Sequence, residues 1–249
     1  MAALNSDQNT EKPKARTPKS TAKSRSTRES IIAVAIELFR TKGYGRTSLS
    51  EISRRAGIDP SSFYYYFPSK EALIDTVFDQ GNTVPPLTLL EELSSNRAAQ
   101  LCSLIIFDTV RKCELPVDFN ELETIATQNR EAFGGFFEHY RMLYKSIVTI
   151  LQRGIAENVF TPCTPDVRAV SILSLDEGLQ HHFHAKHRNE LILEASGYPV
   201  RNYTPENIAQ MAAYSIMPSI VADQAIMETA IDEGTKLYYQ LEEEMGRKR

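Results

Sequence analysis

Apolar residues along most of this chain recur every three or four positions, which is the spacing of one face of an α-helix. Ile31, Val34, Ala35, Leu38 and Phe39 follow this spacing. No segment shows the alternation of polar and apolar residues that is typical of a half-buried strand. The sequence therefore predicts an all-α protein.

Capping sequences divide the first part of the chain into short helices. A capping box starts the first helix at Ser26, and Gly43 is expected to end it. A second capping box opens the next helix at Ser48, and Gly57 follows its last turn.

The third helix is expected to start at the Asp59 N-cap, with Pro60 in the first helical position, and to end at Pro68. A fourth helix runs from near Ser69 to about Gly81. Two short helices joined by a tight turn containing Gly and braced by a first helix predict a helix-turn-helix. The third helix would enter the major groove of DNA, with Ser61, Ser62 and Tyr65 toward bases and phosphates.

Charge is divided unevenly along the 249 residues, although the net charge is only −4. Residues 1–70 hold 13 Lys and Arg against 6 Asp and Glu, whereas residues 71–249 hold 15 against 26. A basic end on an acidic body indicates a polyanionic partner at one end, and the alternative is a solvated basic tail. We expect a disordered basic arm over 1–25, a DNA-binding domain over 26–80 and a second domain over 81–249.

The second domain also reads as helices. Helices are expected over 97–114, near 118–127, over about 129–158, from 165 to about 184, from 205 to about 217, and over about 221–244. Residues 186–203 look like an insertion.

Several classes of protein are made improbable by what the sequence lacks. It carries no signal peptide, no apolar run long enough for a membrane span and no catalytic motif, so we expect a cytoplasmic protein that is not an enzyme and needs no cofactor. Cys102, Cys113 and Cys163 form no CxxC pair and fit a reduced compartment.

Residues 28–78 resemble the DNA-binding region of the TetR/AcrR family of regulators. The matching residues are Ile31, Ile32, Leu38, Phe39, Gly43, Tyr44, Thr47, Ser48, Ile52, Arg55, Ala56, Gly57, Ile58, the run from Ser62 to Phe67, Ser69, Lys70, Ala72 and Leu73.

The resemblance implies a homodimer that binds a double-stranded DNA operator and acts as a repressor, released by a small, apolar or aromatic effector. It also implies that 81–249 is the effector-binding, dimerising domain, with the helices that start at Pro165 and Pro205 as the expected dimerisation elements. The DNA-contacting residues that it implies are Thr47, Ser48, Ser50, Ser61, Ser62, Tyr64, Tyr65, Tyr66 and Lys70. Helix three has no Arg or Gln for bidentate base contacts, so the operator sequence is not predicted. For the tyrosines, and for Tyr66 above all, core packing is the alternative.

An effector pocket is expected among the central helices of the second domain, because ligand cavities are mostly apolar with few polar groups. The expected lining is Leu101, Ile105, Thr109, Phe133, Phe136, Phe137, Tyr140, Tyr144, Asp176, Glu177 and His181. Ordinary core packing is the alternative for the aromatic residues of this set.

His181, His184 and His187 are spaced by three and would lie on one side of a helix. Zinc binds such pairs, but no Cys lies nearby and His is also favoured at a helix C-terminus, so no metal site is expected. The open functional alternatives are a DNA-binding protein of the same fold without an effector, acting in chromosome organisation, a metal-responsive regulator, and an enzyme with an ancillary helix-turn-helix.

Overall fold

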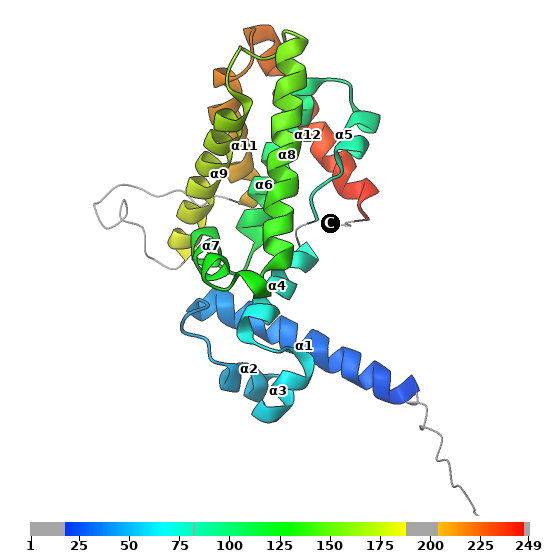
Figure 1. Cartoon of the computed structure of the whole chain (residues 1–249), viewed down its shortest axis with the longest axis vertical. Helices are drawn as coiled ribbons and strands as arrows, with labels where there is room; N and C mark the ends of the chain where they lie inside the picture. The colour runs from blue at the N-terminus through cyan, green and yellow to red at the C-terminus, as the bar shows by residue number, and fades with distance from the viewer. Residues whose placement is uncertain (1–17, 82, 188–203, 247–249) are drawn as a thin grey trace, which may run out of the picture.

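The computed structural model describes residues 18–81, 83–187 and 204–246, and these residues form helices and no strand (Figure 1). The α-helices are α1 (Pro18–Lys42), α2 (Leu49–Arg55), α3 (Pro60–Tyr66), α4 (Lys70–Gly81), α5 (Leu87–Leu93), α6 (Arg97–Glu114), α7 (Phe119–Gln128), α8 (Gly134–Ala156), α9 (Pro165–His187), α11 (Pro205–Ile216) and α12 (Gln224–Glu244). Short 3-10 turns, η1 (Arg130–Ala132) and η2 (Met217–Ser219), precede α8 and α12. The predicted all-α fold is confirmed.

The caps of the helix-turn-helix follow the sequence. Gly43 and Gly57 have φ of +82° and +69°, values that L-residues with a side chain rarely adopt. Ser48 Oγ accepts from the backbone N–H of Glu51, and Asp59 accepts from that of Ser61. Each short helix is therefore fixed at its start by a side chain.

The first helix begins earlier than expected. It starts at Pro18 rather than Ser26, so the last eight residues of the predicted arm, 18–25, are helical. Pro fits the first turn of a helix, and Ala, Lys and Arg in this stretch are good helix formers. The rest of the arm, residues 1–17, lies outside the described residues.

The second domain contains one helix that the sequence did not predict. α5 has only seven residues and no side-chain cap, so its local signal is weak. The expected helix over 129–158 is also interrupted. It divides into η1 and α8 because Asn129 and Phe133 leave helical geometry, with φ of −128° and −117°. Most of the expected insertion, residues 188–203, lies outside the described residues.

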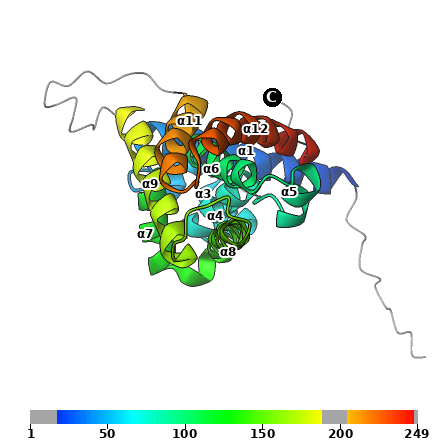
Figure 2. The same cartoon turned by 90° about the horizontal axis from the view of Figure 1, so that it is seen from above.

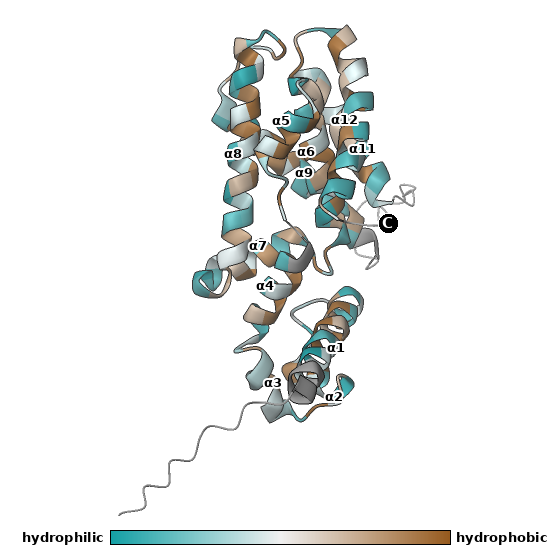
Figure 3. Ribbon diagram, turned by 90° about the vertical axis from the view of Figure 1, so that its right-hand side faces the viewer, coloured by the Kyte–Doolittle hydropathy of each residue, from teal (hydrophilic) through white to brown (hydrophobic). Residues whose placement is uncertain are grey.

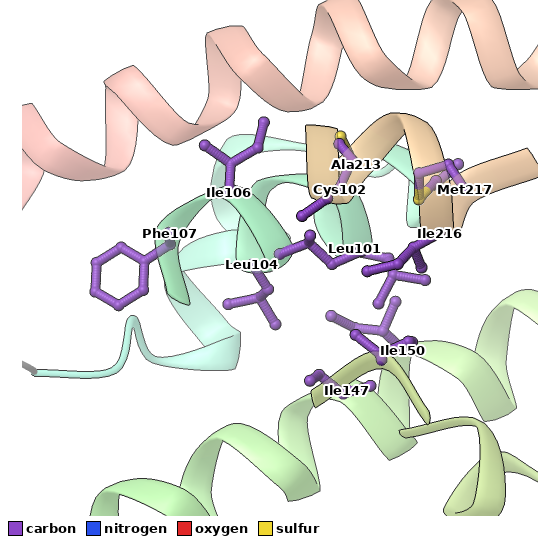
Figure 4. Close-up of a cluster of buried hydrophobic side chains, with 14 of the residues drawn as sticks. Leu101, Cys102, Leu104, Ile106, Phe107, Ile147, Ile150, Ala213, Ile216 and Met217 are labelled. Atoms are coloured by element: carbon purple, nitrogen blue, oxygen red, sulfur yellow. The ribbon is translucent and has the colours of Figure 1, made fainter. Parts of the chain in front are cut away.

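Two hydrophobic cores hold the molecule together. The upper core surrounds α6, which contacts α8, α9, α11 and α12 (Figures 1 and 2). Figure 4 shows Leu101 and Leu104 of α6 between Ile147 and Ile150 of α8 and Ile216 of α11. In Figure 3 brown, hydrophobic positions alternate with teal, hydrophilic ones along these helices.

α12 approaches α6 closely at one glycine. A Cβ on Gly234 would lie 2.6 Å from Cys102 Cβ, which is closer than real carbon atoms approach. Gly234 therefore permits the tight packing of α12 on α6.

No helix among the described residues is long and apolar enough to cross a membrane.

The lower core crosses the expected boundary between the domains. It joins Phe39 of α1 and Phe63 of α3 to Phe119 of α7 and Phe136 of α8. Phe78 of α4 lies against Phe136, with ring centroids 5.2 Å apart. The helix-turn-helix is thus packed against the second domain through a shared hydrophobic core.

Candidate DNA-binding face and regulatory core

α3 presents one face to its own core and another to solvent. Phe63 is fully buried and stacks against Phe67 with ring centroids 5.9 Å apart. Tyr64 and Tyr65, on the other side, are 60% and 63% exposed. Ser62 is exposed as well. This face carries exposed hydroxyl groups and aromatic rings, and its contact with DNA stays a prediction.

The first turns of α2 and α3 are also exposed, but some of their hydroxyls already have partners. Ser48 and Ser50 lie at the surface, and Ser48 Oγ caps α2. The Ser61 hydroxyl donates to Asp59 Oδ1 at 2.7 Å, which leaves its oxygen free to accept. Helix N-termini and hydroxyls are common contacts to DNA phosphate.

Three of the expected DNA-contacting residues, Thr47, Tyr66 and Lys70, are buried or partly buried. Thr47 is 2% exposed and donates to the backbone oxygen of Gly43 at 2.9 Å, so its expected role is wrong and its role in this structure is to fix the turn before α2. Tyr66 is half-buried against the lower core, as in the alternative reading.

Lys70 differs from the expectation as well. Its ammonium group lies 3.8 Å from the centre of the Tyr44 ring and donates to the Tyr44 backbone oxygen at 2.5 Å. Burial lowers the pKa of Lys70. The Tyr44 hydroxyl in turn donates to Glu71 at 3.1 Å. Lys70 therefore braces the start of α4, and a phosphate contact would require it to leave these partners.

Polar contacts reinforce the joint between the helix-turn-helix and the second domain. Arg40 of α1 donates to the backbone oxygen of Glu114 at 3.0 Å. The backbone N–H groups of Gly45 and Phe136 donate to Glu121 and Asp75, each at 3.3 Å. The joint therefore contains hydrogen bonds in addition to the shared lower core.

A buried charge cluster lies at the centre of the second domain. Lys112 Nζ of α6 is 2.8 Å from Asp108 Oδ2, 3.0 Å from Asp176 Oδ2 and 3.6 Å from Glu177 Oε1. The Thr109 hydroxyl also donates to Asp176. One cation thus faces three carboxyl groups in a region with little access to water, and we call these four charged residues the Lys112 cluster.

The Lys112 cluster shifts the titration of its members. Burial alone would lower the pKa of Lys112, but the charges of Asp108 and Asp176 outweigh burial and raise it. Burial raises the pKa of Asp176 despite the attraction of Lys112, and the neighbouring Asp108 adds to the rise. The folded state therefore favours a charged lysine and disfavours charge on Asp176.

In the described part of the chain, most of the expected pocket residues are divided between the two hydrophobic cores and the Lys112 cluster. Leu101 and Ile105 are fully packed in the upper core, whereas Phe133, Phe136 and Phe137 pack in or against the lower core. For these five, the alternative of ordinary core packing describes the structure. Thr109, Asp176 and Glu177 belong to or contact the Lys112 cluster.

The other three expected pocket residues are spread over the domain. Tyr140 packs against both cores. The Tyr144 hydroxyl donates to Asp166 at 2.8 Å, on the surface. His181 Nδ1 lies 2.7 Å from Asp118 Oδ2.

A pocket of about 690 Å³ opens elsewhere, at the joint between the two domains. Arg40 and Arg46 line it from the DNA-binding side, and Leu115, Pro116 and His184 line it from the second domain. None of these residues was predicted as ligand-binding. They belong to segments far apart in the sequence, and no short motif connects them.

The histidine cluster does not form a recognisable metal site in the described residues. His184 Nε2 lies 3.4 Å from the backbone oxygen of Lys112, and His181 is bonded to Asp118. The described residues contain no group of three or more His, Cys, Asp or Glu arranged to hold a metal ion. The side chain of His187 lies outside the described ones.

Comparison with known proteins adds a family match. Residues 31–77, which contain α2, α3, the second half of α1 and most of α4, match the family model described as bacterial regulatory proteins of the tetR family. The helix-turn-helix of this chain is therefore similar to that of the tetR family. This match supports the prediction of a regulator, and it lies in the same stretch that suggested the resemblance.

Two curated relatives match this chain over short stretches. An uncharacterised HTH-type transcriptional regulator of Bacillus subtilis, YuxN, is 52% identical over 44 residues, 18% of this chain and 15% of the relative. EthR of Mycolicibacterium smegmatis is 41% identical over 49 residues, 20% of this chain and 23% of EthR. The matched segment thus spans less than a quarter of either relative.

Solved structures extend the similarity of fold to most of the chain. NalD of Pseudomonas aeruginosa, a repressor of a multidrug efflux pump, aligns with a TM-score of 0.55 and 23% identity over 81% of this chain and 99% of NalD. A regulator from Saccharomonospora viridis, solved with choline, aligns with a TM-score of 0.59 and 20% identity, covering 80% of this chain and all of that one. This similarity shows that most of the chain, including the second domain, shares the fold of these two structures.

Proposed function

We propose that this protein is a cytoplasmic, sequence-specific DNA-binding transcriptional regulator of the TetR family that acts as a repressor. The observation that carries the proposal is the exposed face of α3, where Tyr64 and Tyr65 project from a helix whose other side is fixed in the lower core. A rigid short helix with exposed hydroxyls suits insertion into a major groove.

The chemistry of this face suggests how DNA is read. Tyr64, Tyr65, Ser61 and Ser62 contact phosphates and base edges, and Ser48 and Ser50 reach the backbone beside them. α3 carries no Arg, Asn or Gln, so direct base readout is limited and the shape of the operator contributes to specificity.

The regulator is proposed to act as a homodimer formed by α9 and α11. These two helices pack on each other and leave apolar side chains at the surface. Val167, Val170 and Leu175 of α9 are 65%, 52% and 37% exposed, and Tyr214 of α11 is 60% exposed. Ser171, Ser174 and Gly178 lie on the same exposed side of α9, and small residues allow close helix packing. A pseudo-palindromic operator would match such a two-fold dimer.

An effector is proposed to release the DNA by favouring a different position of the helix-turn-helix relative to the second domain. The support is the joint itself, because the lower core and α4 connect α3 directly to α7 and α8. The effector expected from the sequence is small and apolar or aromatic. NalD, a structural neighbour, is named as a repressor, which favours repression as the outcome.

Selection of DNA tests this proposal. The full-length protein is incubated with a random double-stranded library, bound DNA is sequenced, and the affinity for the selected DNA is measured by fluorescence anisotropy at several salt concentrations. We expect an inverted repeat bound at least about 10³-fold more tightly than random DNA. An absence of any preferred site would contradict the proposal and would favour a general DNA-binding role.

A further inference from the structure

The pocket at the joint between the two domains differs from every site discussed under the proposed function. Arg40 and Arg46 line it from the end of α1 and the turn that leads into α2. Leu115 and Pro116 line it from the segment after α6, and Phe183 and His184 line it from α9. The volume of about 690 Å³ lies within the range of small-molecule sites in proteins.

The two arginines of this pocket donate hydrogen bonds to backbone oxygens. Arg40 donates to a backbone oxygen, that of Glu114, and Arg46 donates to the backbone oxygen of Lys42 at 2.6 Å. Among the residues that the structure describes, neither guanidinium forms an ion pair with a carboxylate. Each guanidinium has five N–H donors in a planar fork, so both retain donors for an anion.

One carboxylate does lie in the lining, and it is already engaged. Glu114 pairs with Arg111 on the same helix. Arg40 and Arg46 therefore leave the pocket with uncompensated positive charge, while Leu115, Pro116 and Phe183 supply an apolar wall. A guanidinium pair beside an apolar wall matches a ligand with one anionic end and one apolar body.

We propose that this pocket binds an organic carboxylate, with its carboxylate group on Arg40 and Arg46 and its apolar body on Leu115, Pro116 and Phe183. Binding there would bridge the two domains, because each domain supplies half of the lining. The turn that carries Arg46 leads directly to Ser48, the N-cap of α2. The ligand would thus bias the position of the helix-turn-helix, and this consequence, unlike the binding itself, rests on the proposed function.

Isothermal titration calorimetry of the full-length protein tests the binding, with 2-naphthoate as the probe. 2-Naphthamide has nearly the same shape without the charge, and 2-naphthylmethylammonium carries the opposite charge. We expect naphthoate to bind at least about tenfold more tightly than either, since charge-assisted hydrogen bonds are about twice as strong as neutral ones. Equal affinities, or no naphthoate binding up to millimolar concentration, would overturn the proposal.

Two substitutions locate the site. Arg46→Gln removes a guanidinium whose described hydrogen bond lies within its own turn, and Arg40→Gln removes the other together with one contact across the joint. Each is expected to weaken naphthoate binding about tenfold. Arg141→Gln is the matched control, because Arg141 is exposed on α8 and pairs with Glu138. Circular dichroism melting checks that Arg46→Gln remains folded, which keeps the test informative if Arg40→Gln does not.

The outcomes separate this proposal from the proposed function. Naphthoate binding that falls in Arg46→Gln and is unchanged in Arg141→Gln supports the site, whether or not DNA selection finds an operator. Naphthoate affinity that is the same in all three variants would place the probe elsewhere and overturn the site, even if the protein binds a selected operator tightly.

Discussion

The exposed face of α3 and the Lys112 cluster use polar side chains in opposite ways. Tyr64, Tyr65 and Ser62 are exposed to solvent. Lys112 and Asp176 are buried, and the Lys112 ammonium lies 2.8 Å from Asp108 and 3.0 Å from Asp176. The polar side chains of the first region lie at the surface, whereas those of the second face one another inside the fold.

This difference predicts which property each substitution changes. A change on the α3 face should alter binding with little effect on stability, and a change in the Lys112 cluster should alter stability first. A change at the joint between the domains should alter both stability and binding. The joint is part of a hydrophobic core, and it also connects the two regions.

Lys112→Met is expected to have the largest effect, a loss of about 3–5 kcal/mol in the free energy of unfolding. Removing the lysine leaves three buried carboxyl groups without a cation. Urea unfolding followed by far-UV circular dichroism measures the loss. Lys236→Met is the control, because Lys236 pairs with Asp232 on an exposed part of α12 and should lose less than about 1 kcal/mol. Similar losses in the two variants would contradict this account of the cluster.

Phe136→Ala tests whether the lower core couples the two domains. The ring is 2% exposed and packs against Phe78 and Phe119, so its truncation should cost about 3 kcal/mol. Phe137→Ala, at the half-buried neighbouring position, should cost less. Limited proteolysis should show the helix-turn-helix cleaved sooner in Phe136→Ala. Unchanged proteolysis would mean that the shared core does not hold α1–α4 in place.

The titration of Asp176 gives a pH dependence with a definite sign. Because the folded-state pKa is raised by burial, folding favours the protonated acid. The associated stability is present below the unfolded pKa of about 3.9 and is lost as pH rises through the raised pKa, by at most about 1.4 kcal/mol per pH unit. Asp176→Asn should reduce this decline, and Asp232→Asn should leave it unchanged. Identical pH profiles for wild type and Asp176→Asn would contradict the assignment.

Ser48→Ala should have a small effect on stability, about 1 kcal/mol, because it removes the cap of α2. Ser50→Ala, in the first turn of the same helix and exposed, should change stability by less than about 0.5 kcal/mol. Thermal unfolding distinguishes the two. A larger loss for Ser50→Ala would show that the cap described for Ser48 is not the contact that fixes α2.

Local rules made the DNA-binding half largely predictable. The caps at Ser48 and Asp59 and the positive φ of Gly43 and Gly57 depend on neighbours a few residues away. Lys70 and Thr47 were misplaced because their partners, Tyr44 and Gly43, depend on how the turn between α1 and α2 folds back. Sequence alone gave the right helix but not the direction of these side chains.

The sequence predicted most helices of the second domain, but it did not predict which residues line a pocket there. The spacing of Phe133, Phe136 and Phe137 identified buried positions, but a buried ring can line a cavity or fill a core equally well. Their partners, among them Phe78, come from the other domain and carry no local signal. The pocket lined by Arg40 and Arg46 depends on contacts between α1 and α6, which are also distant in sequence.

The most direct test of the central claim is the affinity of Tyr65→Ala for DNA selected by the wild-type protein. Fluorescence anisotropy should show binding weakened about tenfold or more, with a loss of unfolding free energy below about 0.5 kcal/mol, since Tyr65 is 63% exposed. Tyr239→Ala, on α12 and far from α3 in sequence, should bind as the wild type does. Unchanged affinity in Tyr65→Ala, together with Tyr64→Ala, would contradict the claim that this face of α3 reads DNA.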